Sequence, residues 1–188
     1  MSSLASRVVR AATKMAEMMS EIEEAVELKD ELINAVDGKV GPLLAEFKRH
    51  PFFLLNLGKE VEATPILKWL LYAEHVAVYS RSFAEVLERG RPVKAIVEWI
   101  KMWSGVLSIR VTWVYEKPSG GEEREQHDYK ILFSVKSRLI DLLMMALLID
   151  DEDLERAASS LRGEEEALKP IVERLKEVFS VIREALRR

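Results

Sequence analysis

The sequence predicts an α+β fold that is predominantly helical, with long helices at both ends around a small antiparallel sheet. Both ends space their apolar residues in alternating steps of four and three, as heptad helices do. The middle contains a stretch in which apolar residues recur at every second position, which is typical of strands. We therefore expect a single domain of residues 1–188, with an N-terminal heptad helix at 1–37, an α+β core at 48–138 and a C-terminal heptad helix at 164–188.

The N-terminal heptad is interrupted only by Lys29 and ends at the stop signal Asp37-Gly38. Its seam consists of Leu4, Val8, Ala11, Met15, Met18, Ile22, Ala25, Leu32 and Val36. A shorter helix should begin at Gly41-Pro42 and end before Pro51. The two heptad ends could pack only on their own domain, but their length and regularity favour packing against helices of another subunit, so we expect a coiled-coil homo-oligomer, either a dimer or a tetramer.

Two further helices are predicted before the strands. Thr64-Pro65 combines an N-cap with a proline at the first helical position, which predicts a helix that runs to Gly90. Arg91-Pro92 repeats the signal and predicts a helix through about Ser104. The preceding apolar run, Phe52 to Leu57, is as consistent with a buried strand as with a helix.

A long β-hairpin at about 106–136 is the clearest strand pattern in the chain. In Val106 to Glu116 one face carries Leu107, Ile109, Val111, Trp113 and Tyr115, and in His127 to Lys136 it carries Tyr129, Ile131, Phe133 and Val135. The turn is expected at Lys117 to Gly121. Because an isolated hairpin is only marginally stable, helices or a further strand must cover its apolar face.

Three helices are predicted after the hairpin. Arg138 to Ile149 is apolar nearly all round and should be the most buried helix. The acids of Asp150 to Asp153 favour the start of a short helix. The C-terminal seam consists of Leu168, Val172, Leu175, Phe179, Ile182 and Leu186. Pro170 should lie in the first turn of that helix, or else kink a helix that begins at Glu164.

Recognisable catalytic and cofactor motifs are absent from the sequence. The chain has no Cys, which excludes thiolate nucleophiles, disulfides and zinc ribbons. His50, His75 and His127 are scattered along the chain, and the neighbouring Glu74 faces away on its helix, so we expect no catalytic or metal-binding histidine. Gly120-Gly121 is followed by acids rather than by the Lys and Ser or Thr of a phosphate loop. These observations predict a protein that is not an enzyme and uses no cofactor or metal.

Composition indicates the cellular setting. Side-chain amides occur only at Asn34, Asn56 and Gln126, while Glu, Lys and Arg are abundant, which is the usual bias of hyperthermophile proteins. No secretory signal follows Met1, and the most apolar run, Leu139 to Ile149, is too short to span a bilayer. We expect a cytoplasmic protein that does not enter membranes.

The middle of the chain combines basic and aromatic residues. Residues 48–138 hold 15 Lys and Arg against 11 Asp and Glu, whereas residues 1–47 hold 5 against 9 and residues 139–188 hold 8 against 12. All four Trp and all four Tyr also lie in the middle segment. Proteins hold single-stranded nucleic acid in a positive groove with aromatic side chains on which bases stack. The alternative for each of these aromatic side chains is that it packs in the hydrophobic core.

The functional prediction is a single-strand binding site in an aromatic cleft between the sheet and its helices, rimmed by Lys and Arg. The residues predicted to line it are Trp103, Trp113, Tyr115, Tyr129, Phe133, Arg81, Lys101, Arg110, Lys130 and Lys136. No recognition helix or basic arm for duplex DNA is visible.

The arrangement resembles the ThermoDBP-related single-stranded DNA-binding proteins of hyperthermophilic archaea. The resemblance is one of size and architecture: an antiparallel sheet (107–115 and 129–135) between heptad helices (4–36 and 168–186), without Cys. It implies sequence-independent binding of single-stranded DNA in a hydrophobic cleft or tunnel rimmed by basic residues, with dimers or higher assemblies and neither metal nor catalysis. The alternative is a structural or adaptor subunit of a larger ribonucleoprotein, held by its heptad helices and without intrinsic affinity for nucleic acid.

Overall fold

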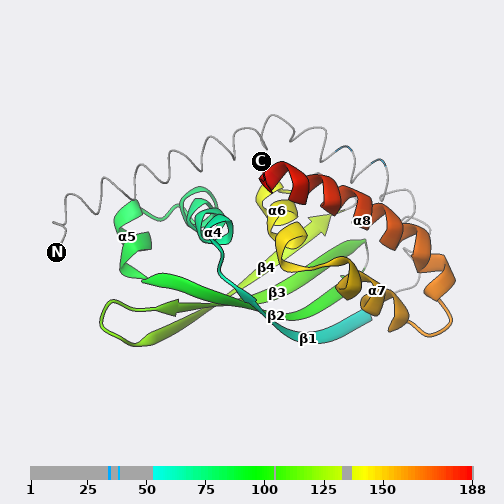
Figure 1. The fold of residues 1–188 in the computed structure, drawn as a ribbon, viewed down its shortest axis with the longest axis horizontal. Helices are drawn as coiled ribbons and strands as arrows, with labels where there is room; N and C mark the ends of the chain where they lie inside the picture. The colour runs from blue at the N-terminus through cyan, green and yellow to red at the C-terminus, as the bar shows by residue number, and fades with distance from the viewer. Residues whose placement is uncertain (1–33, 35–37, 39–52, 104, 133–136, 188) are drawn as a thin grey trace.

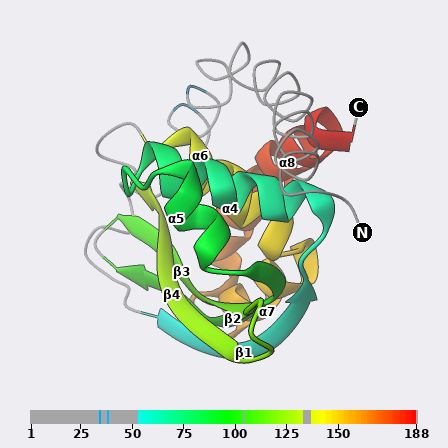
Figure 2. The same cartoon turned by 90° about the vertical axis from the view of Figure 1, so that its left-hand side faces the viewer.

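The structure is a computed structural model that describes residues 34, 38, 53–103, 105–132 and 137–187. Apart from two isolated positions, the predicted helices of residues 1–50 lie outside this part of the chain. The described residues form two layers, in which five helices lie on one side of a four-stranded sheet (Figures 1 and 2). The opposite side of the sheet is covered by no described element (Figure 1).

The sheet is larger than the sequence predicts. Its strands are β1 (Phe53–Glu62), β2 (Arg91–Trp103), β3 (Val106–Glu116) and β4 (Glu122–Leu132), antiparallel and in the order β1-β2-β3-β4. Helix accounts for 46% and strand for 35% of the described residues. The prediction of a predominantly helical fold with long terminal helices around a small hairpin sheet is therefore wrong.

The largest single correction is β2, which occupies the segment predicted to be a helix through about Ser104. Relative to β3, β2 carries one extra residue at Val93 and another at Glu98. Each such bulge shifts the side-chain alternation by one position. The buried residues of β2 are consequently Pro92, Ala95, Val97, Ile100 and Met102, in steps of three and two. Buried residues in steps of three and two do not show the two-residue period of a strand, and they resemble the spacing of apolar residues on one face of a helix.

The hairpin and the ambiguous apolar run resolve as strands. The first hairpin strand, 106–116, is confirmed, and the run that begins at Phe53 is the edge strand β1. The turn is also confirmed, because the Lys117 N–H donates to the Gly121 carbonyl at 2.7 Å and Gly120 has a φ of 92°. The second strand begins earlier than predicted, so that residues 122–126 belong to β4 rather than to a loop.

The helix predicted from 64 to 90 is divided into α4 (Pro65–Ala77) and α5 (Phe83–Glu88). The predicted cap at its start is confirmed, since the Thr64 hydroxyl accepts a hydrogen bond from the Leu67 N–H and Pro65 is the first helical residue. Between the two helices Ser80 has a φ of 52°, in the left-handed region. At the start of β2 Gly90 has a φ of 98°, and a Cβ there would lie 2.3 Å from the Glu116 carbonyl oxygen, so only glycine fits.

The C-terminal helices are α6 (Leu139–Leu148), α7 (Asp151–Ser159) and α8 (Glu165–Arg187). The predicted burial of α6 is confirmed, with seven of its residues buried. Asp150 and Asp153 exchange hydrogen bonds with each other's backbone N–H groups, which forms the capping box at the start of α7. Pro170 lies in the second turn of α8, not the first.

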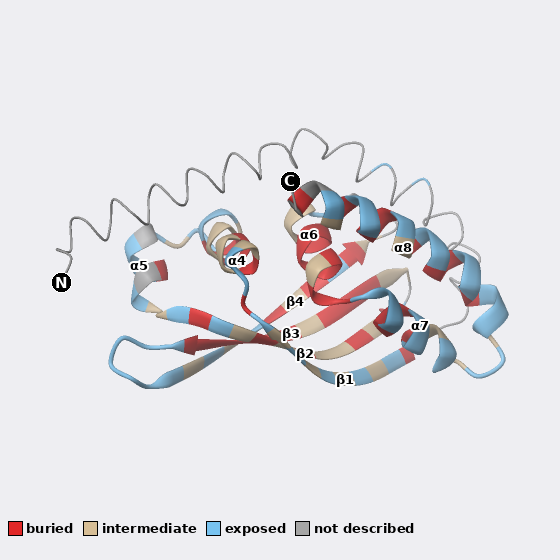
Figure 3. Ribbon diagram, viewed as in Figure 1, coloured by how far each residue is buried: buried red, intermediate tan, exposed pale blue. Residues whose placement is uncertain are grey.

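The C-terminal seam packs within its own chain. All six seam residues are buried, whereas Val181 is 56% exposed. Figure 3 shows buried and exposed positions alternating along α8. Arg183 also donates hydrogen bonds to the Ala146 and Ile149 carbonyls, at 2.6 and 2.7 Å, at the end of α6. The apolar seam of α8 is therefore used in packing within the chain. None of the described helices is long and apolar enough to cross a membrane.

Candidate functional site

The open side of the sheet gathers aromatic and basic side chains at one end. The strand register places Lys101 beside Ser108, which in turn lies beside Lys130. The adjacent row on the same face runs from Trp99 to Arg110 and on to Asp128. Trp103 ends β2 beyond both rows. We call Trp99, Lys101, Trp103, Arg110 and Lys130 the open-face patch.

The two tryptophans of the open-face patch lie in different surroundings. Trp103 is 63% exposed, the highest exposure of any large apolar side chain that the structure describes. Trp99 is half-buried and is flanked by two cations: Lys101 Nζ lies 5.1 Å and Arg110 Cζ 4.9 Å from its ring centroid. Cation–π attraction of this kind fixes the ring and holds the cations on the open face.

Positive charge is less neutralised at this end of the sheet than at the other. Among the described residues, no carboxylate lies within ion-pair distance of Lys101 or Lys130. Arg110 forms a two-point ion pair with Asp128, at 2.9 and 3.2 Å, and this hydrogen bonding raises the pKa of Arg110. At the far end, the basic side chains are paired across or along the strands, as Lys94–Glu60, Arg91–Glu116 and Arg124–Glu122.

Three of the predicted contact residues lie in the core instead. Trp113, Tyr115 and Tyr129 face the helices and are at most 1% exposed, and the Trp113 Nε1–H donates to the Tyr129 hydroxyl at 3.0 Å. Burial raises the pKa of Tyr129 well above its ordinary value. Under α7 and α8, an apolar cavity against the same face of the sheet has a volume of about 20 Å³, room for about one water molecule. The predicted cleft between sheet and helices is therefore filled by the aromatic side chains themselves.

The other predicted contacts divide three ways. Lys101, Trp103, Arg110 and Lys130 come together in the open-face patch, joined by Trp99, which was not among the predicted contacts. Arg81 lies on the other side of the sheet, in the connection between α4 and α5. Phe133 and Lys136 lie outside the described residues.

A buried polar cluster on the helix-covered face was not predicted. The expectation that the histidines are scattered is wrong for His75 of α4 and His127 of β4, whose ring centroids lie 5.6 Å apart. Glu74 adjoins His75 and is also buried, and Glu125 shares the face of His127 because the two are separated by one residue of β4. We call Glu74, His75, Arg81, Glu125 and His127 the histidine cluster.

Carboxylates contact both ring nitrogens of His127 in this cluster. His127 Nδ1 is hydrogen-bonded to Glu74 Oε1, and His127 Nε2 lies 2.8 Å from Glu125 Oε1. Glu125 is held in turn by ion pairs with Arg81, at 3.1 Å, and with Arg89. Glu74 Oε2 is buried without a hydrogen-bond partner among the described residues.

Hydrogen bonding defines the protonation of His75. Arg81 NH1 lies 2.6 Å from His75 Nδ1, and a guanidinium only donates, so Nδ1 carries a lone pair. His75 Nε2 then bears the hydrogen and donates to the Tyr115 hydroxyl at 2.9 Å. Burial, reinforced by the charge of Arg81, lowers the pKa of His75 to about 3. The neutral ring therefore directs a lone pair into the cluster.

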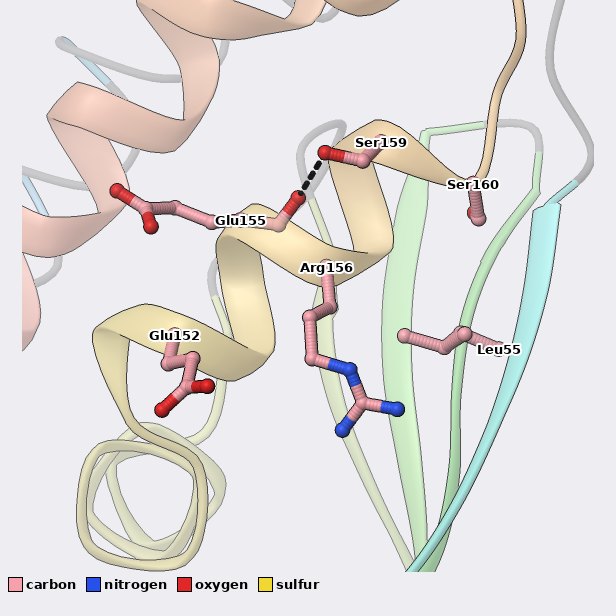
Figure 4. Close-up of a pocket in the computed structure, with 6 residues that line it drawn as sticks. All are labelled: Leu55, Glu152, Glu155, Arg156, Ser159 and Ser160. Atoms are coloured by element: carbon pink, nitrogen blue, oxygen red, sulfur yellow. Dashed lines mark hydrogen bonds between the residues drawn. The ribbon is translucent and has the colours of Figure 1, made fainter.

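Two surface hollows beside α7 contain no comparable arrangement. One, of about 460 Å³, is lined by Leu55, Glu152, Glu155, Arg156, Ser159 and Ser160 (Figure 4). Glu155 points away from Leu55 in this view and pairs with Lys176 of α8. The other, of about 570 Å³, contains the Arg183 side chain that ties α8 to α6. In the second hollow, Lys59 pairs with Asp150 and Glu60 pairs with Lys94.

Comparison of the chain with protein-family models, curated proteins and solved structures found no match. The resemblance to ThermoDBP-related proteins accordingly stays a prediction from the sequence.

Proposed function

We propose that this protein binds single-stranded nucleic acid, DNA or RNA, on the open face of its sheet. The observation that carries the proposal is Trp103, which is 63% exposed near Lys101 on the sheet face that no described element covers. Exposure of an indole to water is unfavourable, and Trp, which has an apolar ring and a polar N–H, is enriched at binding interfaces. Base stacking on an aromatic ring beside cations is the usual chemistry of single-strand recognition.

The open-face patch offers distinct positions for bases and phosphates. Trp99 and Trp103 are four residues apart on one strand, a separation of about 13 Å, so they would stack on different bases. Lys101 lies between them, and Lys130 lies two strands away in the same row, so both are placed to contact phosphates. Stacking and phosphate contacts carry little sequence information, which favours sequence-independent binding.

Arg110 has a different role in this proposal. Its guanidinium is engaged by Asp128 and lies over Trp99, so it orients the Trp99 ring and contributes less to phosphate binding than Lys101 or Lys130. The proposal also includes a non-catalytic role in the cytoplasm and self-association through the heptad at residues 1–37. These parts rest on the sequence pattern.

Fluorescence anisotropy of labelled oligothymidine, oligouridine and duplex DNA, measured at several salt concentrations, tests the proposal. Trp103→Ala should weaken single-strand binding by about 5- to 100-fold, the loss of one stacked base. Lys101→Ala should weaken binding and reduce the slope of log affinity against log salt by about 0.7. Val181→Ala and Lys169→Ala, exposed positions on α8, are the matched controls and should change nothing.

Two outcomes would overturn the proposal. One is the absence of single-strand binding at low salt, and the other is equal binding by the wild type and Trp103→Ala. Stable co-purification with one protein partner, together with no affinity for nucleic acid, would instead support the adaptor role.

A further inference from the structure

We propose that the histidine cluster is a binding site for a divalent transition-metal ion, with His75, Glu125 and His127 as the ligands. The candidate ligand atoms of these three residues all lie within 4.8 Å of one another. Two of the residues are buried, and the Glu125 side chain is 18% exposed, which leaves a way in from solvent. The site is separate from the open-face patch, and the proposal does not depend on nucleic-acid binding.

The donor set suits a first-row metal such as Zn²⁺. Imidazole nitrogen and carboxylate oxygen bind Zn²⁺ at about 2.0–2.2 Å, which places tetrahedral ligands about 3.4 Å from each other. His127 Nε2 and Glu125 Oε1, now 2.8 Å apart, would separate by about 0.6 Å, and ligand atoms as far as 4.8 Å apart would approach by up to about 1.4 Å. Two histidines and one carboxylate also form a set known for other divalent metals, including Fe²⁺.

His75 is prepared as a ligand. Its Nδ1 lone pair points into the cluster, while its Nε2–H is held by the Tyr115 hydroxyl. A metal-binding histidine usually donates its other N–H to a fixed acceptor, which sets the tautomer and orients the ring. The lowered pKa of His75 is consistent with this neutral form.

His127 has the same organisation with a carboxylate as its outer partner. If Nδ1–H donates to Glu74, then Nε2 and Glu125 Oε1 are two acceptors facing each other at 2.8 Å. Either a second proton or a cation must lie between them. A metal ion takes the place of that proton, with Glu74 supporting His127 from behind, as carboxylates do in many zinc sites.

Arg81 now occupies the position of the ion. Its NH1 lies 2.6 Å from His75 Nδ1 and 3.1 Å from Glu125 Oε1, so the guanidinium and the metal exclude each other. Arg81 lies in the connection between α4 and α5, directly after the left-handed Ser80, so its side chain can swing out without unwinding a helix. Among the described residues, Arg89 then remains as the guanidinium partner of Glu125, and Glu74 contacts His127, which leaves a deficit of positive charge that a divalent ion fills.

Metal binding would fasten α4 to β4, because His75 comes from the helix and the other two ligands from the strand. Three protein ligands leave one coordination position for water or another small ligand. The full chain, stripped with EDTA and dialysed, is the protein to test. Titration with Zn²⁺ by calorimetry should show one tight site per chain, and Co²⁺ should develop the visible absorption of a low-coordinate complex.

Substitutions of single carboxylates distinguish metal ligands from residues that do not contribute to the site. Glu125→Gln should remove the tight Zn²⁺ site, and Glu74→Gln should weaken it by about 10- to 100-fold, as loss of an outer partner does. Glu122→Gln lies on the same strand but on the open face, and should leave binding unchanged.

Arg81→Gln provides the sharpest test, because it does not remove a ligand. If Arg81 competes with the metal, Zn²⁺ binds more tightly to the variant. The gain in affinity equals the ratio of the metal-free protein with Arg81 in the site to that with Arg81 outside it, so a ratio of about ten gives about tenfold tighter binding. If the cluster is only an ion-pair network, the same variant loses stability and binds no metal. Absence of a tight site in both the wild type and Arg81→Gln, or a site that persists in Glu125→Gln, would overturn the proposal.

Discussion

The open-face patch and the histidine cluster lie on opposite faces of the sheet, share strand β4, and differ in their access to water. In the patch, the side chains of the Arg110–Asp128 pair are 37% and 33% exposed. In the cluster, those of His127 and Glu74 are 1% and 3% exposed. Both regions combine rings, cations and carboxylates, so composition alone does not distinguish them.

The difference in solvent access determines what each region can bind. Charges on the open face are solvated, so an ion pair there contributes little and is exchanged for a phosphate at small cost. Charges in the cluster have lost water, so each must be satisfied by a neighbour, and removal of one partner leaves another uncompensated. The first region suits a large flexible polyanion, and the second suits a small cation that takes the place of a proton and of Arg81.

The largest expected effect is a difference in stability loss between substitution of the buried Trp113 and substitution of the exposed Trp103. Trp113→Ala should lower the free energy of unfolding by about 3–5 kcal/mol, because it leaves a cavity in the core and the Tyr129 hydroxyl without its donor. Trp103→Ala should lower it by less than about 1 kcal/mol. Denaturation with guanidinium chloride measures both, and similar losses for the two variants would contradict the assignment of Trp113 to the core.

Acidification should weaken the cluster while leaving the open face intact. The unfolded chain protonates His75 near its ordinary pKa of 6.5, whereas the folded, metal-free protein protonates it only near 3. The full contribution of His75 is therefore present above pH 6.5 and declines as the pH falls below it. This one group should lower the free energy of unfolding by about 2 kcal/mol between pH 7 and pH 5.

Guanidinium denaturation in EDTA at the two pH values measures this change. The His75→Gln variant is the control and should depend less steeply on pH. An equal dependence in the variant would assign the acid sensitivity to other groups.

The smallest expected effect on stability belongs to the exposed ion pair. Asp128→Asn should change the free energy of unfolding by less than about 1 kcal/mol. It should also strengthen single-strand binding and raise the salt slope by up to about 0.7, since Arg110 becomes available to a phosphate. Glu122→Gln, which releases Arg124 at the other end of the face, should leave the affinity unchanged. Unchanged binding in Asp128→Asn would exclude Arg110 from the interface.

Several elements were predictable because their signals lie within a few residues of one another. The strand at 106–116 alternates without a bulge, and the Thr64-Pro65 start of α4 and the Asp150 start of α7 carry their own caps. Four of the ten predicted contacts, Lys101, Trp103, Arg110 and Lys130, also come together. The alternation of β3 and β4 places Arg110 and Lys130 on the polar face, so this part of the patch follows from the strand period.

The prediction of a helix in the segment 91–103 is wrong for a physical reason. The bulges at Val93 and Glu98 break its alternation, and Pro92 imitates the start of a helix. The segment is a strand because it pairs with β1 on one side and with β3 on the other. Local propensity contains no information about such pairing.

The sequence by itself determined the hairpin, its turn, the buried helix α6, the capped start of α7 and the apolar stripe of α8. Each depends on backbone geometry that repeats over two to four residues. Only the tertiary structure decided that Trp113, Tyr115 and Tyr129 fill the space where a cleft was expected, and that α8 packs on its own chain. Only the tertiary structure brought His75 to His127, because contacts between residues far apart in the sequence are fixed by the packing of helix on sheet.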